Sequence, residues 1–62
     1  MKKIIISDGF FKEVYKTCSV DYNTIAVSTW GLGIFINTTY IKRDQLQDTI
    51  NRKKANGYIE VK

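Results

Sequence analysis

Residues 22–41 contain no Lys, Arg, Asp or Glu, whereas charged residues flank this stretch on both sides. Within it, residues 24–30 and 34–40 alternate apolar with small or polar side chains, which is the two-residue period of a half-buried strand. Residues 31–33 (Gly-Leu-Gly) separate the two runs and can form a tight turn. The stretch therefore predicts a β-hairpin with Trp30 beside its turn, around which the other residues fold.

The geometry of this turn decides which residues share a face of the hairpin. A two-residue loop at Gly31-Leu32 would be a type II′ turn, with Gly at the first central position, and would pair Thr29 with Ile34. A longer loop with Gly33 in the left-handed conformation is the alternative. With the two-residue loop, the core face holds Ile25, Val27, Ile34 and Ile36. The second face then holds Ala26, Ser28, Trp30, Phe35 and Asn37.

This second face carries no charge, although a solvated face of a sheet usually shows Lys and Glu. Either another part of the fold or a partner has to cover it. The sequence predicts one clear helix, and one helix covers only one face of a sheet. We keep both interpretations, burial of Trp30 and Phe35 in the core and contact with a partner, open at this stage.

The residues before the hairpin predict two further strands. An apolar run at 4–6 indicates a strand, and Asp8-Gly9 is a strong two-residue turn signal. Residues 10–19 also fit a helix that has an apolar stripe and Asp8 as its N-cap. We favour a strand there, because Phe, Val, Tyr, Thr and Cys are mediocre helix formers and suit a pleated surface.

Residues 42–55 predict a helix. Asp44 can cap its start, with Gln47 three residues on in a capping-box arrangement. Basic residues crowd its last turn, where they complement the helix dipole, and an Asn-Gly pair at 56–57 is a stop signal. Residues 58–61 predict a short strand that returns beside the first.

Together these elements predict one α+β domain over residues 1–62. It would be a small antiparallel β-meander of four or five strands with one C-terminal α-helix and a final short strand. If residues 10–19 were helical, the element order would be βαββαβ, that of the ferredoxin-like split βαβ fold, which we keep as the alternative.

The composition limits how so short a chain is stabilised. A chain of 62 residues buries only about 60% of its unfolded surface, and such domains often depend on disulfides, a metal or oligomerisation. Cys18 is the only cysteine and there is no histidine, so we expect no internal disulfide and no metal site. Self-association as a homodimer is the remaining route.

The sequence also favours a cytoplasmic protein that does not engage a membrane. A lone thiol suits a reducing compartment, and no signal peptide is visible. Residues 22–41 have the length of a membrane span, but polar residues and two glycines interrupt them.

No motif for catalysis or for a cofactor is present, and we expect neither. Acid–base and nucleophilic catalysis need a positioned His, a carboxylate pair or an activated nucleophile. Asp44 and Asp48 are four residues apart on the helix, but a capping and a solvated Asp explain them better. Residues 31–33 lack the third glycine of a dinucleotide loop, and Cys18 fits a small buried hydrophobe.

Protein–protein binding is the leading hypothesis. Interface cores are depleted in charge and enriched in Trp, Tyr and Phe, as the second face of the hairpin is. The partner would be a larger protein, a second copy of the chain, or both. The candidate protein-binding residues are Trp30, Leu32, Phe35, Ser28 and Asn37.

Nucleic-acid binding is the alternative hypothesis. The net charge of +4, from 10 basic and 6 acidic residues, favours anionic partners, although solubility alone also explains it. Polar residues on the helix could read base edges, whereas the aromatic face has no basic residue near it in sequence. The candidate residues are Lys42, Arg43, Arg52, Lys53 and Lys54.

The Ile-, Lys- and Asn-rich composition is similar in style to that of short proteins of phages and mobile elements from AT-rich bacteria. The resemblance rests on composition and on no motif. It implies a regulator or inhibitor that acts by docking on a larger host protein.

Overall fold

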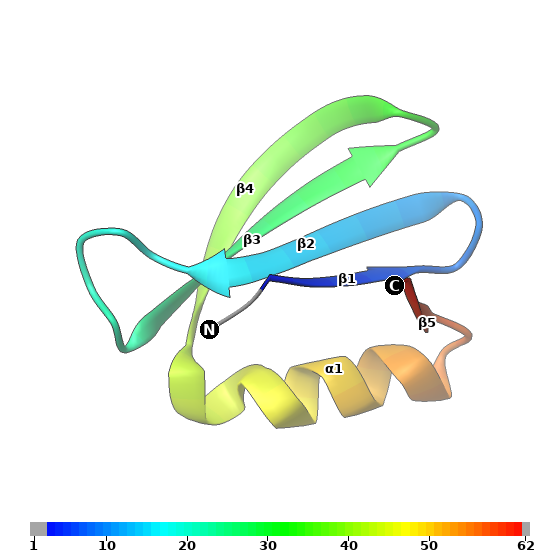
Figure 1. Cartoon of the computed structure of the whole chain (residues 1–62). Coiled ribbons are helices and arrows are strands. Elements are labelled where there is room, and N and C mark those ends of the chain that lie inside the picture. Colours follow the sequence, from blue (N-terminus) through cyan, green and yellow to red (C-terminus); the bar gives the residue numbers. More distant parts are fainter. Residues whose placement is uncertain (1–2, 62) are drawn as a thin grey trace.

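The computed structural model describes residues 3–61, which form a five-stranded antiparallel sheet with an α-helix against it (Figure 1). In chain order the elements are β1 (Ile4–Ser7), β2 (Phe11–Thr17), β3 (Thr24–Gly31), β4 (Ile34–Lys42), a 3-10 turn (Arg43–Gln45), α1 (Leu46–Ala55) and β5 (Ile59–Val61). The strand order across the sheet is β4-β3-β2-β1-β5. The predicted α+β class is confirmed, as are the strand within 10–19 and the final strand beside the first.

The helix packs against one face of the sheet only (Figure 1). Alternate strand residues turn to the same face, and the buried ones on this face are Ile6, Tyr15, Ile25 and Val27. α1 contributes Ile50 to the same cluster. We call this side of the sheet the helix face, and it holds the hydrophobic core.

The β3–β4 hairpin closes later than the sequence predicted. Leu32 and Gly33 form its two-residue loop, with φ of 52° and 81°, and Gly31 pairs with Ile34. Both central residues have positive φ, as a type I′ turn requires, so the predicted type II′ turn at Gly31-Leu32 and its register are wrong. A type I′ turn matches the twist of the flanking strands, which offsets the strain of a left-handed Leu32.

A β-bulge shifts the register of this hairpin once more. Trp30 pairs with Phe35 but Thr29 pairs with Asn37, so Ile36 is an extra residue in β4. The residues of β4 beyond the bulge therefore face the opposite side from the one that a regular ladder would give them, because the side chains of a strand alternate.

Two residues that we expected in the core are exposed. Ile34 is 70% exposed and Ile36 is 51% exposed, whereas Ile25 and Val27 on β3 are buried as predicted. The tip of the hairpin extends beyond the reach of α1 (Figure 1), so no second layer covers β4 there.

α1 begins later than predicted and without the predicted cap. Lys42 is still the last residue of β4, and the chain passes from it directly into the 3-10 turn. Asp44 lies inside that turn, and neither cap position makes a side-chain hydrogen bond. Gln47 donates instead to Oδ1 of Asn51 at 2.9 Å. The predicted stop is confirmed, since Gly57 follows the helix with φ of 100°.

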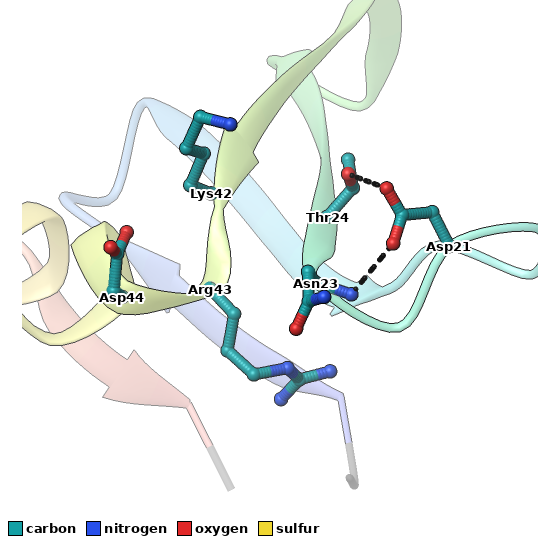
Figure 2. A pocket seen from close by; sticks show the side chains of 6 residues that line it. All are labelled: Asp21, Asn23, Thr24, Lys42, Arg43 and Asp44. Carbon is teal, nitrogen blue, oxygen red and sulfur yellow. Dashed lines mark hydrogen bonds between the residues drawn. The ribbon is translucent and has the colours of Figure 1, made fainter.

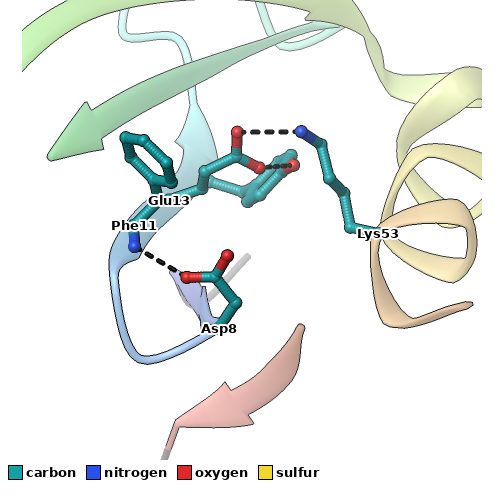
Figure 3. A network of polar contacts seen from close by, with 5 residues as sticks. Asp8, Phe11, Glu13 and Lys53 are labelled. Carbon is teal, nitrogen blue, oxygen red and sulfur yellow. Dashed lines mark hydrogen bonds and ion pairs between the residues drawn. The ribbon is translucent and has the colours of Figure 1, made fainter. Parts of the chain in front are cut away.

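A buried polar chain ties α1 to the helix face (Figure 3). The Tyr15 hydroxyl donates to Oε1 of Glu13 at 2.6 Å, and Nζ of Lys53 lies 3.3 Å from Oε2 of Glu13. Both carboxylate oxygens of the buried Glu13 therefore have a partner. Burial, and then the hydrogen bond to Glu13, raises the pKa of Tyr15 above its ordinary value.

Replacing Tyr15 with Phe should lower the free energy of unfolding by about 2 kcal/mol at neutral pH, because a hydrogen bond to a buried carboxylate is lost. Urea denaturation measures this. The pKa of Tyr15 is higher in the folded state than in the unfolded state. The stability that the Tyr15 hydroxyl contributes is therefore complete below pH 10.0 and is lost as the pH rises above that value. Tyr40→Phe, which removes an exposed hydroxyl, is the control and should change nothing. A Tyr15→Phe protein as stable as the wild type would contradict the buried hydrogen bond.

Asp8 closes the β1–β2 hairpin. Its Oδ1 accepts the backbone N–H of Phe11 at 2.7 Å (Figure 3) and that of Phe10 at 2.8 Å. These hydrogen bonds, that from Phe11 first, lower the pKa of the Asp8 carboxyl below its ordinary value. The predicted turn at Asp8-Gly9 is present, and Gly9 takes a φ of 93° there, but it is longer than the two-residue turn that the sequence indicated, because Ser7 pairs with Lys12.

Asp8→Asn should make the stability of the protein less dependent on pH in acid solution. A carboxyl with a lowered folded-state pKa contributes stability above its ordinary pKa of 3.8 and loses it as the pH falls further. Asparagine keeps an acceptor oxygen but does not titrate, so the melting temperature should fall less steeply below pH 3.8 than in the wild type. Asp48→Asn on α1 removes one carboxylate elsewhere and serves as the control. Equal acid slopes for Asp8→Asn and the wild type would contradict this role.

Candidate functional site

The face of the sheet opposite α1 has no layer over it within residues 3–61 (Figure 1), and we call it the open face. Residues paired across neighbouring strands share a face, so its membership follows from the register. From β4 toward β5, the first row holds Phe35, Trp30, Lys12, Ser7 and Ile59. The second holds Thr38, Ser28, Val14, Ile5 and Val61, and the third holds Tyr40, Ala26 and Lys16.

Large apolar rings on the open face are in contact with solvent. Phe35 is 52% exposed and Tyr40 is 63% exposed, while Trp30 is half-buried. Apolar side chains gathered on one surface mark an interaction site more often than single scattered ones do. Trp30 and Phe35 do not belong to the core, which lies on the other face, so the first of the two interpretations left open by the sequence is wrong.

Trp30 is the centre of a small cluster in the first row. Its ring and that of Phe35 meet edge to face, with centroids 5.3 Å apart and planes at 70°. On its other side, Nζ of Lys12 lies 5.3 Å from the Trp30 ring centroid, a cation–π contact. Trp30 is therefore in contact with one aromatic and one cationic side chain, and neither of them belongs to the core.

The three rows repeat a pattern. In the first and third rows an aromatic ring stands on β3 or β4 and a lysine stands on β2. Between them, the hydroxyl oxygens of Ser28 and Thr38 lie 3.4 Å apart. The open face thus carries a column of rings beside a column of positive charges, with hydroxyl groups at its middle.

None of the six acidic residues of the chain lies on the open face. Glu13 and Glu60 are on the helix face, where they pair with Lys53 at 3.3 Å and with Lys54 at 3.6 Å. The other four acidic residues lie in turns or in the helical segment. Negative charge is therefore confined to the helix side and the ends of the strands.

The lysines of the open face make no ion pair within residues 3–61, although Lys42 lies beside the pocket that Asp21 and Asp44 also line. Lys12, Lys16 and Lys42 make no ion pair with any of the residues that the structure describes, and all three are exposed. Lys42 stands opposite Thr24 at the end of the same face. Lys12 and Lys16 therefore place positive charge, without an ion pair to any described residue, beside the aromatic column.

The structure brings together three of the five residues predicted to bind protein. Trp30, Phe35 and Ser28 share the open face. Asn37 does not, because the bulge turns it toward the helix face and Thr38 takes its place. Leu32 stands in the turn and is 69% exposed.

Sequence reasoning did not place three residues of the open face beside Trp30. They are the two lysines that give the face its charge and a further aromatic ring, namely Lys12, Lys16 and Tyr40. Lys12 and Lys16 share one side of β2, and that alternation was visible once residues 10–19 were taken as a strand. Their position beside Trp30 depends on the β2–β3 register, which no local pattern reveals. Tyr40 joins the face only because of the bulge.

The basic residues predicted to bind nucleic acid do not form one surface. Lys42 is on the open face, whereas Lys53 and Lys54 make ion pairs on the helix side. Arg52 lies exposed on α1.

Arg43 is anchored within the fold. Its Nε donates to the backbone oxygen of Tyr22 at 2.8 Å, and its Nη2 donates to Oγ1 of Thr17 at 2.7 Å. The guanidinium carbon lies 3.8 Å from the centroid of the Tyr22 ring. Arg43 therefore fastens the start of the helical segment to the β2–β3 turn.

A pocket of about 280 Å³ lies beside this anchor (Figure 2). Its lining residues are Asp21, Asn23, Thr24, Lys42, Arg43 and Asp44. Asp21 accepts the backbone N–H of Asn23 and the Thr24 hydroxyl, each at 2.9 Å, and these bonds lower the pKa of its carboxyl. Figure 2 shows the Lys42 and Arg43 side chains directed away from each other. The polar groups do not converge on one point, so we assign no ligand to this pocket.

The chemistry of the remaining side chains is sparse. Within residues 3–61, no three His, Cys, Asp or Glu side chains gather closely enough to hold a metal ion. Cys18 is a free, half-buried thiol. The same residues include no helix with the length and apolar character to cross a membrane.

Comparison with protein-family models, with curated proteins and with solved structures finds no match for this chain. The function is therefore inferred from the geometry and charge of the open face.

Lys12→Ala should uncover the ring of Trp30. Trp30 is the only tryptophan, so its fluorescence reports on this face alone. Acrylamide should quench it more steeply in the variant, and stability should fall by about 0.5–1 kcal/mol as the cation–π contact is lost. Lys54→Ala, on the helix side, should leave the quenching unchanged. Identical quenching of Lys12→Ala and wild-type protein would show that Lys12 does not cover Trp30.

Proposed function

We propose that this protein is a non-enzymatic binding module whose contact surface is the open face. The observation that carries the proposal is the position of Trp30 and Phe35 on a sheet face that α1 does not cover. Aromatic side chains supply most of the binding energy in many interfaces, and a flat sheet face presents them at fixed spacing.

The charge of the open face supports a partner that is anionic. Surfaces that bind one another carry complementary potentials, and this face has exposed lysines and no carboxylate. Two copies docked face to face would bring two sets of Lys12, Lys16 and Lys42 into one interface. Like-charge contact of that kind opposes association, so self-association through this face is not part of the proposal.

The helix side is a weaker candidate for contact. Lys53 and Lys54 already have acidic partners, and Glu13 and Glu60 would repel a polyanion there. A module that binds through the open face and has no catalytic activity acts by covering the surface of its partner. This suits a small regulator or inhibitor, the role that the sequence suggested.

The combined substitution Phe35→Ala with Tyr40→Ala should reduce capture of the partner at least tenfold, because two exposed rings are lost from one surface. Immobilised protein is exposed to a lysate of the source cells, and the captured material is compared between variants. Val20→Ala removes an apolar side chain that is 89% exposed but lies off the open face, and it should capture as the wild type does. The proposal would be refuted if Phe35→Ala with Tyr40→Ala left capture unchanged, or if Val20→Ala abolished it.

A further inference from the structure

We infer that the anionic partner is a single-stranded nucleic acid, which lies along the strands with its bases on the ring column and its phosphates on the lysine column. The inference rests on the proposed function, since it names the partner of the same open face. It depends on the juxtaposition of Trp30, Phe35 and Tyr40 with Lys12 and Lys16.

The two columns run parallel to the strands. Lys12 and Lys16 are four residues apart on β2, so their Cα atoms are separated by about 13 Å along the strand. Tyr40 on β4 and Lys16 on β2 are separated by two strand spacings, or about 10 Å. A chain that alternates flat apolar groups with anionic groups can therefore contact a ring and a lysine in each of two rows.

Unpaired bases fit the ring column better than any other anionic partner does. Every base has a face that stacks on an aromatic ring whatever the sequence, but in a duplex those faces are already occupied by neighbouring base pairs. An acidic protein offers carboxylates to the lysines and can pack apolar side chains on Phe35 and Tyr40, which stand exposed at the same edge, but only a nucleic acid carries a stacking ring and an anionic group in every repeating unit. The combination of rings and cations therefore favours single strands.

The middle row supplies groups that suit the same ligand. Thr38 is exposed, and its hydroxyl lies 3.4 Å from that of Ser28. Hydroxyl groups donate and accept hydrogen bonds, so they can meet base edges or sugar oxygens between the two stacked positions. No Asp or Glu belongs to the rows of the open face, so no carboxylate in them repels a phosphate.

Lys12 couples phosphate binding to exposure of Trp30. In the free protein its ammonium group lies over the Trp30 ring at 5.3 Å. A phosphate on the lysine column draws that group away and leaves the ring face open to a base. Binding should therefore change the fluorescence of the only tryptophan, which gives a signal from within the site.

The test uses the full chain and purified probes. Oligothymidine and oligouridine of about 12 nucleotides, a DNA duplex of the same length and polyglutamate are each titrated while Trp30 fluorescence is recorded. Both single strands should quench Trp30 saturably, and a preference for one of them tells DNA from RNA. If Lys12, Lys16 and Lys42 each contact a phosphate, a plot of log affinity against log salt concentration should have a slope of about −2.

Substitutions at exposed positions separate the two columns. Lys12→Gln with Lys16→Gln should weaken binding at least tenfold at low salt and reduce the slope to about −0.7, because one lysine contact remains. Tyr40→Ala should weaken binding about tenfold with the slope unchanged. Arg52→Gln, which removes an exposed charge from α1, is the matched control and should bind as the wild type does.

Three results would overturn the inference. One is equal binding of duplex and single strands, with no effect of Tyr40→Ala. Another is binding of polyglutamate but of neither oligonucleotide, and the third is no saturable change in Trp30 fluorescence with any probe. If lysate capture still depends on Phe35 and Tyr40 after nuclease treatment, the inference fails while the proposed function stands. Capture that is independent of both residues defeats the proposed function itself.

Discussion

A single helix of ten residues can cover only one face of a five-stranded sheet, and the rest of this molecule depends on that limit. α1 closes the core over Ile6, Tyr15 and Ile25, which are almost completely removed from solvent. The opposite face receives no such layer. Its aromatic side chains stay in contact with water, and burying that apolar surface against a partner would be favourable.

The division of charge follows the same boundary. On the helix face, each of the two strand carboxylates, Glu13 and Glu60, forms an ion pair with a lysine of α1. Tyr15 donates a hydrogen bond to the second oxygen of Glu13. On the open side there are lysines without carboxylates. A net charge of +4 by itself says little about partners, but two of the lysines that contribute to it, Lys12 and Lys16, stand without an ion pair among residues 3–61 and on the same face as three aromatic rings.

Much of the fold was predictable because it depends on local patterns. The alternation in β3 identified Ile25 and Val27 as core residues, and the weak helix propensity of residues 10–19 identified β2. The composition of the open face was not predictable, because one extra residue in β4 exchanges Asn37 for Thr38 and brings Tyr40 to the same side. The proximity of Lys12 to Trp30 depends on strand pairing between segments far apart in the chain, for which the sequence carries no short-range signal.

Side-chain NMR, recorded with and without a single-stranded oligonucleotide, measures directly whether ligand contacts the open face. The resonances of the Trp30 indole, the Tyr40 ring and the Lys12 and Lys16 ammonium groups should shift together. Those of Tyr15 and Ile50, buried between the sheet and α1, should stay in place. Shifts confined to α1, or spread equally over both faces, would contradict an open face that serves as the binding surface.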